Sequence, residues 1–151
     1  MQAEQPALTT MHPSLSVTDV RSSVAFYVDK LGFNSHGVYE QDGVAIHAEV
    51  SAGSIHFMFG PAAIAEGTWA GTLTAGVPAG AGVIFYTALD QGIDEYYESV
   101  RSAGARIVDE IGDRFWGDRT FSVEDPDGYL LQFAQHVKDF PAAMLESMKP
   151  S

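Results

Sequence analysis

The feature that most constrains this chain is an order of predicted elements that occurs twice, about seventy residues apart. In the first half, hydrophobic periodicity predicts a strand, a helix and three strands at 15–17, 20–31, 35–40, 44–50 and 54–59. The second half repeats this order with elements at 83–88, 93–103, 106–110, 120–123 and 129–134. The repetition indicates an α+β fold made of two βαβββ modules in tandem, and a short helix is expected at 140–148.

Short motifs mark the ends of these elements. Asp19 and Asp90 are placed to cap the two helices, and Gly32 is placed to end the first. Asp42-Gly43 is a strong hairpin signal between two predicted strands. The turn Asp125-Pro-Asp-Gly128 has proline and glycine where a type I turn favours them.

The 151 residues are expected to form one domain of four segments. These are a first module at 11–60, a Gly/Ala-rich linker or lid at 61–81 that contains Trp69, a second module at 82–136 and a C-terminal extension at 137–151. A chain of this length buries about two-thirds of its unfolded surface and needs no cross-links to be stable.

Composition excludes several classes of function. The chain has no cysteine, which excludes disulfides, thiolate metal ligands and a catalytic thiol. Eight Lys and Arg against twenty Asp and Glu give a formal net charge of −12, which disfavours nucleic acid and anionic membranes as partners. A cationic ligand would be attracted, although such a charge is also common in acidic soluble proteins. No signal peptide or spanning segment is visible, so we expect a cytoplasmic protein.

Alternation along the predicted strands separates two faces of the sheets. One face is apolar and is expected to pack under the helices: Leu15, Val17, Ile55, Phe57, Phe59, Ile84, Tyr86, Leu131 and Phe133. The other face is mixed: His12, Ser14, His56, Met58, Val83, Phe85, Thr87, Leu130, Gln132 and Ala134. A mixed concave face suits a small-molecule cup, and a partly wet dimer interface is the alternative.

The chain resembles the vicinal oxygen chelate superfamily, the group of glyoxalase I, bleomycin resistance proteins and extradiol dioxygenases. The resemblance covers about residues 11–136 and rests on Phe26-Tyr27, Leu31-Gly32-Phe33, Trp116-Gly-Asp-Arg119 and Asp125-Pro-Asp-Gly-Tyr-Leu-Leu-Gln-Phe133. It implies the glyoxalase/bleomycin-resistance-like fold, in which the modules form curved half-barrels. It also implies a homodimer.

The resemblance further implies where a metal would bind. Enzymes of this superfamily hold a divalent ion with ligands from the first, fourth, fifth and eighth strands, which here carry His12, His56, Val83 and Gln132. Valine cannot ligate, and a neutral amide is a poor substitute for a carboxylate on a hard cation. We therefore expect no cofactor, and no catalytic residue is assigned, although His56 is the best candidate for acid–base chemistry.

Two functions follow from the resemblance. The first is a bleomycin-resistance-like protein that binds a small organic molecule, cationic or aromatic, in the cup without a complete metal site. The residues expected to bind the ligand are His12, Ser14, His56, Met58, Phe85, Trp116 and Gln132. The second is a divalent-metal-dependent lyase, isomerase or dioxygenase with a reduced site of His12, His56 and Gln132.

Trp116 is equally consistent with a loop anchor, and Arg119 is expected to be structural, paired with Asp118 or Asp125.

Overall fold

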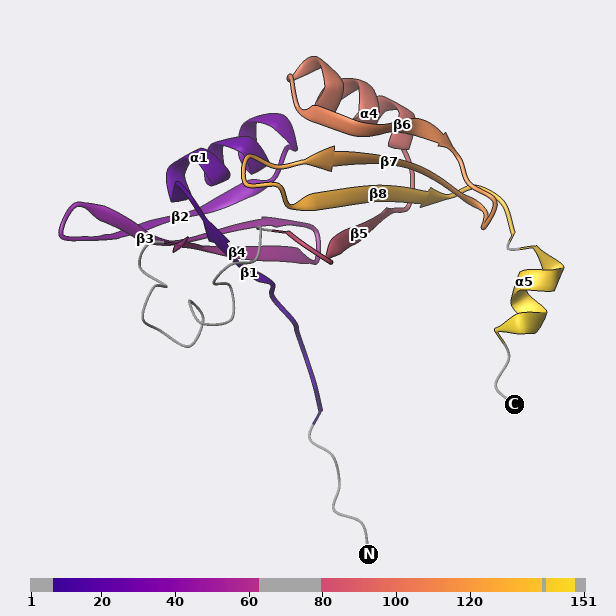
Figure 1. Ribbon diagram of the computed structural model, residues 1–151, viewed down its shortest axis with the longest axis horizontal. Coiled ribbons are helices and arrows are strands. Elements are labelled where there is room, and N and C mark those ends of the chain that lie inside the picture. The colour runs from indigo at the N-terminus through magenta and orange to yellow at the C-terminus, as the bar shows by residue number, and fades with distance from the viewer. Residues whose placement is uncertain (1–6, 63–79, 140, 149–151) are drawn as a thin grey trace, which may run out of the picture.

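The computed structural model describes residues 7–62, 80–139 and 141–148, and these residues form two four-stranded sheets (Figure 1). The strand orders are β1-β4-β3-β2 and β5-β8-β7-β6, with the first pair of each sheet parallel and the others antiparallel. The first sheet contains β1 (Ser14–Val17), β2 (Asn34–Gln41), β3 (Val44–Ala52) and β4 (Ile55–Pro61). The second contains β5 (Ile84–Leu89), β6 (Arg106–Asp113), β7 (Asp118–Glu124) and β8 (Leu130–His136). The predicted α+β repeat is confirmed.

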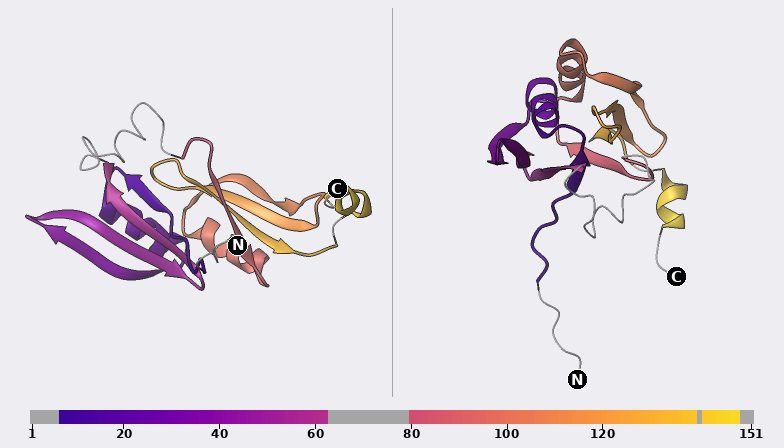
Figure 2. Two further views of the ribbon diagram at one scale, coloured as in Figure 1. Left: turned by 90° about the horizontal axis from the view of Figure 1, so that it is seen from below. Right: turned by 60° about the vertical axis from the view of Figure 1, so that its left-hand side comes forward.

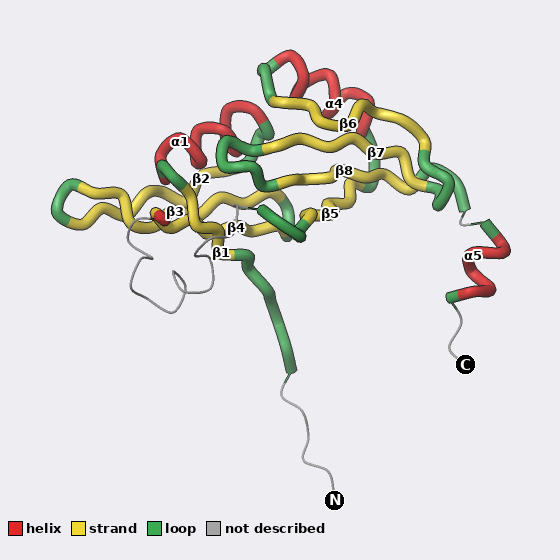
Figure 3. The backbone as a smooth tube through the Cα atoms, viewed as in Figure 1, coloured by secondary structure: helices red, strands yellow, loops and turns green. Residues whose placement is uncertain are grey.

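Helices lie on one side of each sheet (Figure 3). They are α1 (Val20–Ala25), which continues as the π-helical turn η1 (Phe26–Lys30), and α4 (Ile93–Ser102). The C-terminal helix α5 (Ala142–Ser147) lies beyond the end of the second sheet, and residues 7–13 leave the body on the side opposite α1 (Figure 1). Most of the expected linker, including Trp69, lies outside the described residues.

Local sequence explains most element boundaries. Asp19 caps α1, because its carboxylate accepts a hydrogen bond from the Ser22 backbone N–H at 2.9 Å. Asp42 and Gly43 both have positive φ, 52° and 77°, as the predicted two-residue hairpin requires. The expected cap at Asp90 is wrong. Helix α4 begins at Ile93, whose N–H donates instead to Gln135 on β8 at 2.9 Å.

The core lies between the helices and the sheets. Tyr27 of η1 is fully buried against the rings of Phe57 and Phe59, with centroids 5.4 and 5.2 Å away. The predicted buried residues of β1 and β8, and Phe57 and Phe59 on β4, all face this core. Alternation therefore predicted the face correctly on these three strands.

Strand β5 presents the opposite face from the one predicted. Phe85 packs edge-on against Phe57 at 5.0 Å and Thr87 is buried, whereas Ile84 and Tyr86 are 57% and 49% exposed. Parallel pairing with β8 decides this, because Phe85 and Thr87 lie beside its buried residues Leu131 and Phe133. Large apolar side chains occupy both alternating sets of positions between Val83 and Ala88. The sequence pattern of this strand therefore does not indicate which of its sides faces the core.

The Asp125–Gly128 turn joins the two modules. The buried Asp125 carboxylate accepts hydrogen bonds from the backbone N–H groups of Asp127 and Tyr129 and from the Tyr27 hydroxyl, at 2.9, 2.9 and 3.0 Å. Asp127 accepts from the Thr18 N–H at 2.8 Å. Burial raises the pKa of Asp125. Burial also raises the pKa of Tyr27, and the nearby negative charge of Asp125 raises it further. This turn therefore holds the second module against the first.

Candidate binding face

Figure 2 (left) shows the ribbon of the two sheets from below, with the view of Figure 1 as reference. The sides of the sheets opposite α1 and α4 carry polar, aromatic and ionisable side chains. In the first sheet, three imidazole rings form a stack, which we call the histidine column: His12, His56 and His36. The rings of His12 and His56 lie 4.2 Å apart and 10° from parallel, and those of His36 and His56 lie 5.5 Å apart at 13°. The column brings together residues from the arm before β1, from β4 and from β2.

Glu49, on β3, lies beside this column. Its Oε1 is 2.9 Å from Nε2 of His56, and its Oε2 is 3.7 Å from Nε2 of His47. The hydrogen bond with His56 is the largest influence on Glu49 and holds its pKa below the ordinary value, so the carboxylate is ionised at neutral pH. His36 is in turn held by Ser51, whose Oγ is 2.6 Å from its Nε2.

Sequence reasoning missed three members of this arrangement. His36, His47 and Glu49 were given no role from the sequence. Alternation along β3 was the available signal, because Glu49 lies between the buried Ala48 and Val50 and must point to the opposite side. The proximity to His56 depends on the antiparallel register of β3 with β4, in which Glu49 is opposite Met58.

A cavity of about 470 Å³ lies where β4 meets β5. His56 and Phe57 line it from the first sheet, and Phe85 and Tyr86 line it from the second. Met11 and Pro13 of the N-terminal arm also line it. The cavity is therefore shared by both modules and borders the histidine column.

A second cluster lies on the other sheet and centres on Asp118. This carboxylate accepts hydrogen bonds from the hydroxyl of Tyr86 and from Nε1 of Trp116 at 3.3 Å, and it lies 3.1 Å from Nδ1 of His136. Burial would raise the pKa of Asp118, but the hydrogen bonds with Tyr86, His136 and Trp116 outweigh it and lower that pKa. Asp118 is thus a second ionised carboxylate next to aromatic rings.

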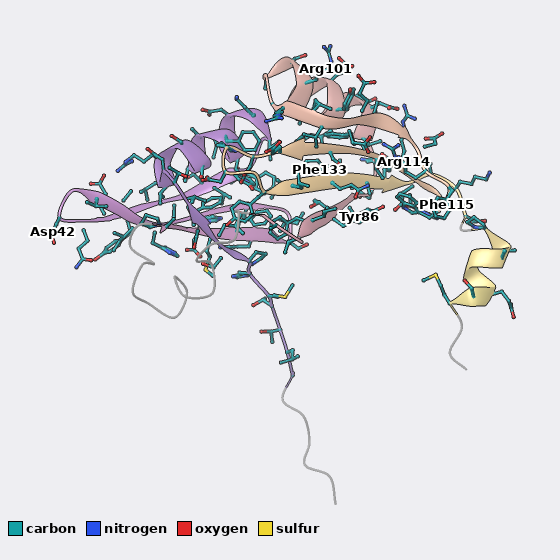
Figure 4. All side chains as sticks on the ribbon, viewed as in Figure 1. Asp42, Tyr86, Arg101, Arg114, Phe115 and Phe133 are labelled. Carbon is teal, nitrogen blue, oxygen red and sulfur yellow. The ribbon has the colours of Figure 1, made fainter. Side chains whose placement is uncertain are left out.

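Trp116 is both an anchor and part of this surface. Its Nε1 also donates to the Tyr86 hydroxyl at 2.9 Å, and its ring packs edge-on against Phe115, which is 77% exposed. Figure 4 shows Phe115 and Tyr86 at the same end of the second sheet. The following Gly117 has φ of 103°, and a Cβ there would meet the Lys138 carbonyl oxygen at 2.1 Å, so the turn requires glycine.

The seven predicted ligand-binding residues are distributed over four places. His12, His56, Ser14 and Met58 lie on the open side of β1 and β4, and His12 and His56 touch. Gln132, on β8, instead donates to Thr120 Oγ1 at 3.3 Å and does not line the 470 Å³ cavity. Trp116 belongs to the Asp118 cluster.

Phe85 and Arg119 each correct an expectation. Phe85 reaches the cavity only from the core side, so its predicted outward orientation is wrong. Arg119 is structural, as expected, but its partners are Asp94 and Asp113, both at 2.9 Å, instead of Asp118 or Asp125.

The positions expected to hold a metal do not fit one. Imidazole nitrogens coordinate in the plane of the ring, and the parallel planes of His12 and His56 do not converge on one ion. Val83 offers no donor, and the amide of Gln132 is engaged with Thr120. Within residues 7–62, 80–139 and 141–148, no group of three His, Asp or Glu side chains has the geometry of a metal site.

Two βαβββ modules, with helices on one side and an open ionisable face on the other, define the glyoxalase-like class of fold. A family model described as Glyoxalase/Bleomycin resistance protein/Dioxygenase superfamily matches residues 9–133, and the chain belongs to this superfamily. Bleomycin resistance proteins of Geobacillus stearothermophilus and Staphylococcus aureus are 33% identical to it over 132 residues, which cover 83% of this chain and 96% of each relative.

Solved structures show the same fold. TioX from Micromonospora sp. ML1 superposes with a TM-score of 0.65 and 25% identity, covering 85% of this chain and 99% of that one. A glyoxalase/bleomycin resistance protein/dioxygenase from Nocardioides superposes with a TM-score of 0.69 and 21% identity, covering 90% and 87%. In the described part of the chain, no helix has both the length and the apolar character needed to cross a bilayer.

Proposed function

We propose that this protein binds a planar, cationic organic molecule of the bleomycin class on its open face and holds it without chemical change. The observation that carries the proposal is the pairing of an ionised carboxylate with stacked or clustered rings on each sheet. Glu49 lies beside the histidine column, and Asp118 lies beside Tyr86 and Trp116. Carboxylates attract a cation, and flat rings stack on a planar ligand.

Three further features support this reading. The formal net charge of −12 favours association with a cation. Bleomycin resistance proteins are among the curated relatives, at 33% identity over 83% of this chain. The side chains at the positions expected to bind a metal are poor ligands for a divalent ion. This favours ligand binding over metal-dependent lyase, isomerase or dioxygenase chemistry.

The proposal includes a homodimer. One chain covers a ligand on its open face from one side only, and the exposed side chains of Ile84 and Tyr86 border the cavity. Strand β5 is also the edge of its sheet. A second copy related by two-fold symmetry would cover both the edge and the ligand. We expect the dimer to reside in the cytoplasm.

Calorimetric titration with metal-free bleomycin tests the proposal. We expect saturable binding of about one molecule per chain at pH 8, and mass spectrometry of the recovered drug should show an unchanged mass. A drug that does not bind, or one that is recovered chemically modified, contradicts the proposal. The ethidium cation, which is planar and permanently charged, serves as a second ligand without titratable groups.

A further inference from the structure

A second cavity, which we call the rear cavity, lies where the two modules meet on the helical side of the sheets. Its volume is about 250 Å³. Leu31, at the end of η1, and Phe33 line it from the first module, and Tyr96 of α4 and Phe133 of β8 line it from the second. The Tyr96 hydroxyl donates to the Leu31 carbonyl oxygen at 2.7 Å, so a hydrogen bond links the modules at this cavity.

Strand alternation places the rear cavity on the side opposite the histidine column. Ala52 on β3 and Ile55 on β4 both line it. They belong to the same alternating sets as Val50 and Phe57, which are buried in the core under the helices. The rear cavity adjoins the 470 Å³ cavity, because Ile55 and residues 87–88 line both, but the rest of its wall is separate.

The wall of the rear cavity is uncharged and offers hydrogen-bond acceptors. None of the described residues that line it has a charged side chain, and an ion is costly to transfer from water into such surroundings. Its hydroxyl groups belong to Tyr96 and Thr87, and both use their protons within the protein. Tyr96 donates to the Leu31 carbonyl, and Thr87 donates to the Phe85 carbonyl at 3.4 Å. The hydroxyl oxygens can still accept, so a neutral molecule with its own N–H or O–H group fits this wall.

Aromatic rings give the rear cavity its shape. The rings of Tyr96 and Phe133 lie 5.1 Å apart at 84°, so they form a corner with two perpendicular surfaces. A planar ligand can stack on one surface and contact the other with its edge. An apolar cavity of about 150 Å³ holds benzene, so 250 Å³ suits one or two fused rings. Gly32 gives access from solvent, because it is exposed and a Cβ there would meet nothing within 4 Å.

We propose that the rear cavity is a second ligand site, for a neutral planar molecule of one or two fused rings that carries one N–H or O–H donor. The proposal does not depend on the proposed function, because a cation on the open face and a neutral ring in the rear cavity are recognised by different groups. A ligand in the rear cavity contacts both modules of the folded chain. Its binding therefore stabilises the folded state by mass action.

Calorimetric titration with indole tests the site, because indole is neutral and has two fused rings and one N–H. We expect one molecule per chain with a dissociation constant below about 1 mM. At about ten times that constant, indole should raise the melting temperature by about 3–5 °C. Benzofuran has nearly the same shape but no donor, and it should bind about three- to tenfold more weakly. Absence of indole binding, or equal binding of benzofuran, overturns the proposal.

Ala52→Phe locates the site, because the new ring occupies the rear cavity. Ala52 lines this cavity and not the 470 Å³ one. The variant should weaken indole binding at least tenfold and leave bleomycin binding within about twofold. Ala45→Phe is the matched control, since Ala45 lies on the same strand, is also half-buried and lines neither cavity. It should keep the wild-type affinity for indole, and an equal loss in both variants overturns the site.

A measurement on the wild type keeps the proposal testable if Ala52→Phe does not fold. In an NMR titration, indole should shift the backbone amide signals of Leu31, Gly32 and Leu89, which line only the rear cavity of the two. Shifts confined to His56 and Tyr86, or displacement of ethidium by indole, would place indole on the open face and overturn the proposal. If indole binds as expected and bleomycin does not bind, the proposed function is wrong while the rear site stands.

Discussion

Removing the Phe57 ring should cost a large part of the stability of this protein. Phe57 is 2% exposed, and its ring lies against Tyr27 at 5.4 Å, Phe85 at 5.0 Å and Phe33 at 6.2 Å. Truncation to alanine removes the buried apolar surface and leaves a cavity among these rings. For Phe→Ala in a core the cost is about 3–5 kcal/mol, a large part of a typical 5–15 kcal/mol total.

Equilibrium urea unfolding measures this directly. We expect Phe57→Ala to lower the free energy of unfolding by about 3–5 kcal/mol and the melting temperature by roughly 10 °C for a chain of this size. Phe115→Ala is the matched control. It removes the same ring from an exposed position and should cost less than about 0.5 kcal/mol.

His56→Ala distinguishes the two faces of β4. Its side chain is 23% exposed and lies on the open side, next to Phe57 in sequence. The variant should stay folded with a stability change below about 1 kcal/mol, and it should weaken bleomycin binding by about 1–2 kcal/mol, the value of a lost hydrogen bond. If His56→Ala unfolds the protein while Phe57→Ala is silent, the register of β4 and the binding face are both wrong.

Four other outcomes are expected. Asp125→Ala removes the acceptor for two backbone N–H groups and for Tyr27, and should cost about 2–4 kcal/mol in urea unfolding; a cost near zero would show that the turn does not hold the modules together. Because the pKa of Glu49 is lowered in the folded state, its stabilisation is present above the ordinary Glu value and is lost as pH falls through the lowered one. Glu49→Gln should therefore lose less stability than wild type between pH 5 and pH 3, and an identical loss contradicts the pairing with His56. Elemental analysis of protein purified without chelator should give well under one equivalent of divalent metal per chain, whereas a stoichiometric ion bound by His12 and His56 would favour the enzyme reading. Sedimentation at micromolar concentration should give the mass of a dimer, and the mass of a monomer would contradict the proposal that a second copy covers the open face.

Local and periodic features of this protein were readable from the sequence alone. The hairpin at Asp42-Gly43 and the cap at Asp19 depend on a few neighbouring residues, whose conformational preferences act without the rest of the fold. Clean alternation on β1, β4 and β8 also identified the core face, because burying apolar area selects one parity. The repeat followed from the order of such elements, and the resemblance to the superfamily rested on that order together with motifs such as Asp125-Pro-Asp-Gly128.

Tertiary structure decided which side chains meet. Strand β5 is apolar at both parities, so only its pairing with β8 turned Phe85 inward and Tyr86 outward. Glu49 and His56 lie seven residues apart in sequence and become hydrogen-bond partners through the register of β3 and β4. The column needs residues from three separate segments. A hydrogen bond or a ring stack depends on distances of a few ångströms between strands, and sequence periodicity specifies the face of a strand but not its neighbour across the sheet.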